Sequence, residues 1–222
     1  MYRKQLGIFV RVPEPGRVKT RLSPSLTPAQ ACRLYEAFLC DLFRRLKKLP
    51  KEQTTVFFSG DGPDALDPFI PDRAIRREQR GADLGERLVT AFDELLAEPR
   101  GPAVIIGSDS PDIPLRYIRL AYRKLKHKDV VLGPAADGGY YLVGLRAPVP
   151  QLFEKIAWGT GGVLGQTLEV IARENLSVFT LPLWYDVDSA EGLRTLKTSL
   201  QARRLERRDR LFATERVLDD IY

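Results

Sequence analysis

The sequence predicts an α/β protein in which helices cover both faces of a mainly parallel, mixed β-sheet. Short β-rich segments alternate along the chain with longer amphipathic segments, the order typical of sheets with crossover helices. The β-rich segments are continuous apolar runs, as expected of strands buried on both faces. With 222 residues, of which 44% are apolar, the chain can bury a substantial core, and we expect one domain over residues 1–222.

The predicted elements follow from two periodicities. The strand candidates are rich in β-branched and aromatic residues, and they are Leu6–Val12, Thr54–Ser59, Ala103–Gly107, Asp129–Leu132, Tyr140–Leu145 and Ser177–Leu181. Between them, apolar residues recur three and four positions apart, which is the spacing of one helix face. This spacing predicts helices through Tyr35–Leu46, Leu84–Leu96 and Leu164–Ala172, and a further helix starts near Pro114.

Cysteine and histidine are scarce, which excludes several kinds of site. One histidine and two cysteines cannot form a His/Cys zinc site and argue against a Cys-His or Ser-His catalytic centre. Cys32 and Cys40 lie eight positions apart in a helical pattern, so about 12 Å separates them, too far for a disulfide. No apolar run approaches the ~20 residues of a membrane-spanning helix. We expect a reduced, cytoplasmic protein that does not bind membranes.

The net charge of +6 is concentrated near the C-terminus. Between Arg194 and Arg210 there are seven Arg or Lys residues and two acids, within a basic helical segment of about 194–222. Its leucine spacing favours a solvated helix face, and no aromatic residue interrupts the basic run to stack on bases. A nucleic-acid patch is the alternative.

The loop after the first predicted strand is basic. In open α/β sheets ligands bind beyond the carboxyl ends of the strands, so this loop, Pro13–Leu22, lies where a ligand is expected. Gly16 stands at its turn, and its basic residues with the end of the strand are Arg11, Arg17, Lys19 and Arg21. Arginines bind phosphate oxygens bidentately and lysine adds a point charge. The Walker pattern is absent, and an ordinary exposed basic loop is the alternative.

Two further loops carry carboxylates. Asp109 follows an apolar strand too closely to cap a helix, which favours a metal ligand. Asp112 is either functional or the cap of the helix near Pro114. Asp186 and Asp188 follow the last predicted strand, and Asp188 is either a ligand or part of a capping box. A basic loop beside such carboxylates is what a nucleotide-using transferase with a divalent cation needs.

Two glycine-rich segments are explained first by local backbone structure, as a turn and as a helix start. Asp137-Gly138-Gly139 lies between apolar runs and predicts a hairpin turn, and its glycines would also let a substrate approach the backbone. The segment Gly159–Gly165 fails the dinucleotide-binding pattern, and Thr160 is predicted to cap a helix there. Packing is the favoured role of Trp158 and Trp184, with base stacking as the alternative.

Several segments, taken together in their order along the chain, resemble a known family. They are Gly7–Leu22, Gln79–Arg87, Gly107–Pro114, Gly133–Leu145 and Tyr185–Leu193, and the resemblance reaches to about Leu200. The family is that of the GT-A-fold glycosyltransferase-like proteins, formerly a domain of unknown function and sometimes found beside radical-SAM genes. It belongs to the nucleotide-diphospho-sugar transferase superfamily, with molybdenum-cofactor guanylyltransferase and phospholactate guanylyltransferase as distant relatives.

The resemblance implies a GT-A (Rossmann-like) α/β/α sandwich and a set of site residues. Those for the nucleotide would be Arg11, Gly16, Lys19, Arg21, Gln79, Gly81, Asp83 and Ser108, with Lys19 and Arg21 on the phosphates. Asp109 and Asp188 would bind Mg²⁺ or Mn²⁺, and Lys19, Arg21 and Asp109 would be catalytic. Asp137, Gly138, Gly139 and Tyr140 would face the sugar or acceptor.

The function expected from these features is metal-dependent transfer from a nucleotide-activated donor to a small acceptor. Glycosyl transfer from a nucleoside-diphosphate sugar is the leading hypothesis. The close alternative is a guanylyltransferase-like nucleotidyl transfer from a nucleoside triphosphate, which releases pyrophosphate. A basic nucleic-acid-binding module is a further alternative, which would leave the acidic loops unexplained.

Overall fold

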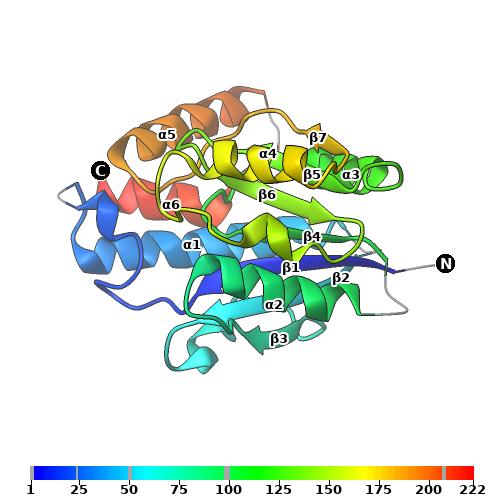
Figure 1. The fold of residues 1–222 in the computed structure, drawn as a ribbon. Helices are drawn as coiled ribbons and strands as arrows, with labels where there is room; N and C mark the ends of the chain where they lie inside the picture. The colour runs from blue at the N-terminus through cyan, green and yellow to red at the C-terminus, as the bar shows by residue number, and fades with distance from the viewer. Residues whose placement is uncertain (1–2, 24, 50–51, 98–100, 207–208) are drawn as a thin grey trace.

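The computed structural model describes residues 3–23, 25–49, 52–97, 101–206 and 209–222. Seven strands form one sheet in the order β3-β2-β1-β4-β6-β5-β7 (Figure 1). The strands are β1 (Lys4–Arg11), β2 (Glu52–Ser59), β3 (Ile75–Glu78), β4 (Ala103–Gly107), β5 (Val130–Pro134), β6 (Tyr140–Leu145) and β7 (Val178–Thr180). The helices are α1 (Pro28–Leu46), α2 (Leu84–Leu96), α3 (Leu115–Lys124), α4 (Val163–Arg173), α5 (Ala190–Leu205) and α6 (Phe212–Ile221), with 3₁₀ turns η1 (Thr20–Leu22), η2 (Pro63–Leu66) and η3 (Pro150–Phe153).

The sheet is mixed, as predicted. Among the described strands β6 alone runs antiparallel to its neighbours β4 and β5, and the other pairs are parallel. The edge strand β3 was missed by the sequence analysis. Its sequence Ile-Arg-Arg-Glu lacks an apolar run because it pairs with β2 only and is half-buried or exposed along its length. The predicted α/β class is confirmed.

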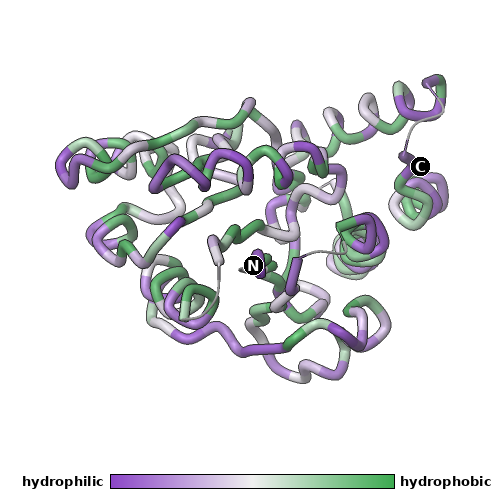
Figure 2. Tube along the Cα trace, turned by 90° about the vertical axis from the view of Figure 1, so that its right-hand side faces the viewer, coloured by the Kyte–Doolittle hydropathy of each residue, from purple (hydrophilic) through white to green (hydrophobic). Residues whose placement is uncertain are grey.

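The core has two halves, one on each face of the sheet. Along β1, Leu6, Ile8 and Val10 pack into the half that contains α1, α3, α5 and α6, whereas Phe9 packs into the half with α2 and α4. Figure 1 shows α2 and α4 in front of the sheet, and Figure 2 shows hydrophobic and hydrophilic residues alternating around the helices. Full burial of such a side chain stabilises the fold by about 1.5–3 kcal/mol.

Helix α1 connects the core to the edge of the sheet where a ligand was predicted. Thr27 and Gln30 form a capping box at its start, with Pro28 in the first turn. Its buried face includes Tyr35 and Phe38, and α6 packs against it. Cys32 and Cys40, both on this helix, are free thiols, as predicted. Within the described part of the chain, no helix combines the length and apolar character needed to cross a membrane.

Candidate functional site

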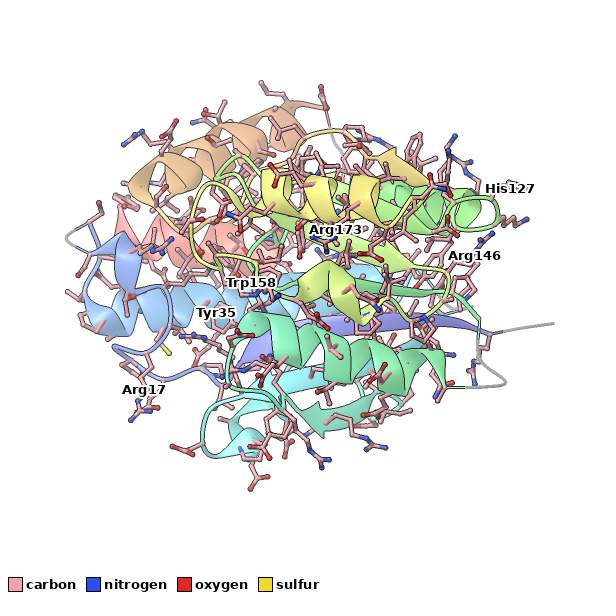
Figure 3. The ribbon with its side chains drawn as sticks, viewed as in Figure 1. Arg17, Tyr35, His127, Arg146, Trp158 and Arg173 are labelled. Carbon is pink, nitrogen blue, oxygen red and sulfur yellow. The ribbon has the colours of Figure 1, made fainter. Side chains whose placement is uncertain are left out.

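A pocket of about 710 Å³ opens at the carboxyl ends of β1 and β4, the edge where the sequence predicted a ligand. Its walls come from the loops after β1 and β4, the β5–β6 turn and the segment that leads to α5. Figure 3 shows Tyr35 and Trp158 toward the end of the sheet where Arg17 lies, and His127 at the opposite end. No histidine is among the described residues that line the pocket, so its chemistry depends on other groups.

The basic loop after β1 has a folded backbone. The amides of Arg17 and Val18 donate to the carbonyl of Glu14 at 3.0 and 3.3 Å, and Gly16 adopts a φ of 83°, which favours glycine. Val18 and Leu22 are buried in the core and anchor the loop. The arginines of this loop and of the last position of β1 stay exposed at the rim of the pocket, and they are Arg11, Arg17 and Arg21.

Lys19 turns from this loop into the protein. Its φ of 52° lies in the left-handed region, which is uncommon for a residue with a side chain. The side chain is 2% exposed, and Nζ donates to Oδ1 of Asp109 at 2.5 Å and to Oδ1 of Asp188 at 2.6 Å. Burial alone would lower the pKa of Lys19, but the two carboxylates outweigh burial and raise it above its ordinary value. Lys19 is therefore charged at neutral pH and links three loops.

Backbone and hydroxyl hydrogen bonds hold the loops that carry the two carboxylates. The amide of Val187 donates to the carbonyl of Asp109 at 2.9 Å, which joins the loop after β4 to the segment before α5. The Tyr35 hydroxyl lies 2.8 Å from Oγ of Ser108 and accepts a hydrogen bond from the amide of Arg11 at 2.9 Å. The ends of β1 and β4 are thus held together by one side chain of α1.

A third carboxylate makes the floor of the pocket strongly acidic. The pKa of Asp186 is raised from 3.8 to about 6, first by burial and then by repulsion from Asp188, Asp137 and Asp109. Excess negative charge in a partly buried site favours a cation.

Asp109 and Asp188 fit a divalent cation. Their oxygens come from two different loops and converge within 2.6 Å of one cationic atom, and their side chains are 45% and 35% exposed. Mg²⁺ binds oxygen ligands and takes only one or two carboxylates, with water and substrate phosphate completing its shell. No group of three or more metal-ligating side chains occurs within the described ranges, so such a cation would depend on this sparse set.

The β5–β6 turn forms the opposite wall of the pocket. Gly138 donates to the carbonyl of Ala135 at 3.1 Å, and Oδ1 of Asp137 accepts from the amide of Gly139 at 2.9 Å, which confirms the predicted hairpin turn. Gly138 has a φ of 89°, and a Cβ there would overlap the carbonyl oxygen of Gly161.

Beside this turn, an aromatic pair lines the pocket. Tyr140 meets the ring of Trp158 edge-on, with ring centroids 6.2 Å apart. Trp158 thus packs, as favoured from the sequence, and also reaches the pocket. The two walls differ in character: one is basic, and the other is acidic, aromatic and glycine-rich.

Residues 42–160 match the family described as "Uncharacterized protein conserved in bacteria (DUF2064)". The chain belongs to the DUF2064 family. A candidate nucleotide-diphospho-sugar transferase from Desulfovibrio desulfuricans G20 is 33% identical, with a TM-score of 0.89 over 100% of this chain and 97% of that chain. Both findings support the superfamily predicted from the sequence. A search of curated proteins finds no match.

Two more distant structures share the fold of this DUF2064 protein. CMP:2-keto-3-deoxy-manno-octonic acid synthetase, in a complex with CTP, is 12% identical with a TM-score of 0.59, covering 90% of this chain and 99% of that chain. A cytidylyltransferase from Leptospira borgpetersenii serovar Hardjo-bovis is 15% identical with a TM-score of 0.54, covering 91% and 88%. At these identities the likeness shows the fold alone.

The DUF2064 protein brings together only some of the residues predicted for the nucleotide. Those that line the pocket are Arg11, Lys19, Arg21, Gln79 and Ser108, whereas Gly16, Gly81 and Asp83 do not line it. Asp83 instead caps α2, where Oδ1 accepts from the amide of Glu86 at 2.9 Å. Of the residues predicted for the sugar or acceptor, Asp137, Gly139 and Tyr140 line the pocket, and Gly138 shapes the turn behind it.

Gln79 has a structural role that the sequence did not reveal. Its side-chain amide donates to the carbonyls of Val10 at 3.2 Å and Phe57 at 3.0 Å. These bonds tie the segment after β3 to β1 and β2. The carbonyl oxygen of the Gln79 side chain remains available to accept a hydrogen bond from a ligand.

Asp112 is not a helix cap, so the structure rejects one of the two roles that the sequence left open for it. Pro114 occupies the N-cap of α3 and no side chain caps that helix. Asp112 is fully buried, and its carboxylate receives hydrogen bonds from Trp184 Nε1 at 3.2 Å, Tyr185 Oη at 2.7 Å and Ser199 Oγ at 3.1 Å, and pairs with Arg203 at 3.4 Å. It anchors α5 and the start of the segment that carries Asp186 and Asp188.

Two other predicted caps also differ. Ser189 caps α5 by accepting from the amide of Gly192 at 3.2 Å, so Asp188 is free for the site. Gly162 is the N-cap of α4, and Oγ1 of Thr160 accepts from its amide at 3.3 Å, one turn before the helix. In both cases the sequence pattern is right about the helix start and misplaces the cap by one or two residues.

Three arginines of the basic C-terminal segment form ion pairs within the protein. Arg203 pairs with Asp112, Arg204 with Asp219 at 3.1 Å, and Arg204 and Arg210 both with Glu215. The remaining basic residues of the predicted run include Arg207 and Arg208, which lie outside the described residues. The ion pairs favour a structural role for this segment over a nucleic-acid patch.

Arg87 and Tyr35 are site residues that the sequence analysis missed. Arg87 lines the pocket from α2, and its Nε donates to the carbonyl of Gly81 at 3.0 Å. The sequence signal that could have identified Arg87 is a cationic residue one turn into a helix that follows a glycine turn. Tyr35 gave no signal, because its spacing is that of an ordinary core residue.

Proposed function

We propose that this protein is a metal-dependent transferase that uses a nucleotide-activated donor, and that the donor is a nucleoside-diphosphate sugar. The observation that carries the proposal is the convergence of Asp109 and Asp188 on one cationic position, in a pocket rimmed by arginines. The relative from Desulfovibrio desulfuricans G20, described as a candidate nucleotide-diphospho-sugar transferase, supports the reaction class at 33% identity.

The basic wall is suited to the donor phosphates. Arg11 and Arg21 are exposed at the rim, so their guanidinium groups can each form two hydrogen bonds to phosphate oxygens. Asp109 and Asp188 would hold Mg²⁺ or Mn²⁺, and the bound cation would neutralise the negative charge that develops on the departing diphosphate. Most of the catalysis would then be electrostatic and positional.

The opposite wall is suited to the sugar and the acceptor. The turn at Asp137 and the Tyr140–Trp158 pair offer a carboxylate, backbone groups and aromatic surface next to the acidic floor. Aromatic faces bind the apolar sides of sugars, while carboxylates accept hydrogen bonds from hydroxyl groups. Gln79, directly after β3, and Arg87, on α2, would then face the nucleoside.

Nucleotidyl transfer is a second candidate, favoured by the likeness in fold to a synthetase in complex with CTP and to a cytidylyltransferase. In that reaction an acceptor phosphate attacks the α-phosphate of a nucleoside triphosphate and pyrophosphate leaves. Release of pyrophosphate from a triphosphate donor, with no turnover of sugar nucleotides, would establish this alternative.

The experiment that tests the proposal is calorimetric titration of nucleoside diphosphates with and without Mn²⁺. In Asp109→Asn and in Asp188→Asn the metal-dependent part of binding should fall strongly, because each substitution replaces one of the two proposed carboxylate ligands by a neutral amide oxygen. Asp83→Asn is the matched control, since asparagine caps a helix as well as aspartate does and Asp83 does not line the pocket. Full metal dependence in Asp109→Asn would contradict the proposal.

A further inference from the structure

The ammonium group of Lys19 lies where the proposed function requires a divalent cation. Nζ is 2.5 Å from Oδ1 of Asp109 and 2.6 Å from Oδ1 of Asp188, which are hydrogen-bonding distances to both proposed ligands at once. A divalent cation bound to the same two oxygens would stand within a few ångströms of this positive charge and would repel it. The two cations therefore compete for one pair of carboxylates.

The protein is built to hold Lys19 in this place. The backbone takes a left-handed conformation at Lys19 (φ 52°), which directs the side chain inward from an otherwise exposed loop. The rings of Tyr35 and Phe38 lie 5.8 and 5.7 Å from Nζ, within the range of cation–π attraction. The side chain is 2% exposed, whereas those of its two carboxylate partners are 45% and 35% exposed and face the pocket.

We propose that Lys19 is a resident counter-ion, which a divalent cation must displace before Asp109 and Asp188 can bind metal. The inference rests on the proposed function, because it concerns the same two carboxylates. In the metal-free protein, Lys19 then binds the carboxylates on the acidic side of the pocket, whereas its sequence motif suggested a place on the donor phosphates.

Displacement of Lys19 couples the metal to the donor. A buried ammonium that loses both carboxylates is left without a partner, which is unfavourable. A diphosphate that arrives with the metal supplies a new anionic partner for Lys19. Metal and diphosphate therefore strengthen each other's binding, and by thermodynamic linkage the factor is the same in both directions. Free metal alone binds weakly.

The test is a direct calorimetric titration of Mn²⁺ alone into wild type, Lys19→Met and Arg17→Met. Removing the ammonium leaves Asp109 and Asp188 unpaired beside Asp186, so Lys19→Met should bind Mn²⁺ at least about tenfold more tightly than wild type. Arg17→Met removes one charge from the same loop, but that side chain is exposed and paired with Glu14 at 3.2 Å. Its Mn²⁺ affinity should change by less than about threefold.

Two results would overturn the inference. One is an Mn²⁺ affinity of Lys19→Met that is equal to or weaker than that of wild type, including no binding by either. The other is an equal gain in Arg17→Met, which would show only a general effect of net charge. Because Mn²⁺ is titrated without nucleotide, failure to bind any nucleotide would reject the proposed function and leave this test intact.

A second measurement needs no variant, in case Lys19→Met does not fold. Amine labelling of wild type, followed by peptide mass spectrometry, reports how accessible each lysine is. Lys19 should be protected without metal and become more reactive at saturating Mn²⁺, while exposed Lys126 stays constant as the internal control. Lys19 that reacts as fast as Lys126 without metal, or that ignores Mn²⁺, would overturn the inference.

Discussion

Asp112→Asn is the substitution with the clearest expected consequence for both stability and the site. It keeps the shape of the side chain but replaces one carboxylate oxygen by an amide group that donates hydrogen bonds. In the protein, Oδ2 accepts from Tyr185, Ser199 and Arg203, and Oδ1 accepts from Trp184. The hydroxyl groups can rotate to accept from the new amide, but the guanidinium of Arg203 has no acceptor to offer.

The size of the effect follows from burial. The side chain of Asp112 is fully buried and that of Arg203 is 15% exposed. Removing one partner of a buried pair costs about 3–5 kcal/mol. Arg203 keeps its hydrogen bonds to the carbonyls of Asp112 at 3.1 Å and Asp209 at 3.0 Å, which argues for the lower end, about 3 kcal/mol. For a chain of this size, that loss lowers Tm by about 6–12 °C.

Urea unfolding and thermal unfolding of Asp112→Asn measure this loss, and Asp41→Asn is its matched control. Asp41 is equally buried, pairs with Arg44 at 3.1 Å and accepts from the amide of Thr214 at 2.8 Å, but it joins α1 to α6 away from the pocket. Both variants should be destabilised, and only Asp112→Asn should also weaken metal-dependent nucleotide binding. A loss below about 1 kcal/mol, or equal weakening of binding in Asp41→Asn, would refute the reasoning.

Three further predictions concern single groups of the site. The pKa of Asp186 is raised from 3.8 to about 6 in the folded protein, so the folded state binds this proton more tightly than the unfolded state does. Without metal, the free energy of unfolding should therefore fall as the pH rises from about 4 to 6. Asp186→Asn should remove that slope in urea titrations across this pH range. Gly138→Ala, at φ 89° and against the carbonyl of Gly161, should lower Tm clearly in thermal scans, and an unchanged Tm would contradict the close packing of the turn. Arg21→Ala should weaken a nucleoside diphosphate far more than the bare nucleoside in calorimetry, and equal weakening would mean that Arg21 does not bind phosphate.

Buried parallel strands and amphipathic helices made most of the fold predictable. Ala103–Gly107 and Tyr140–Leu145 were predicted with their observed bounds, because their apolar runs end at residues that change direction or polarity. The edge strand Ile75–Glu78 was missed, because a strand with one neighbour and little burial needs no apolar pattern. Local sequence therefore reports burial well and strand pairing poorly.

The site was predictable in place but not in its pairings. The topological rule identified the edge of the sheet, and Asp109 and Asp188 do come together there. That Lys19 lies between them, and that Asp112 anchors α5, depends on contacts between residues 90, 169 and 91 positions apart in the chain. No pattern of spacing along the sequence contains that information.

The role of the basic C-terminal run, for which the sequence favoured a solvated helix face and left a nucleic-acid patch as the alternative, also depends on contacts between distant residues. Arg203, Arg204 and Arg210, on α5 and in the segment after it, pair with the buried acids Asp112 and Glu215, so part of this positive charge is neutralised within the protein. What a ligand meets is the pocket, where exposed arginines form one wall and carboxylates lie at the floor. An anion alone would be attracted to the arginines and repelled by the carboxylates. The proposed ligand, a diphosphate with its divalent cation, carries both charges and would be complementary to the arginines and to the carboxylates at once.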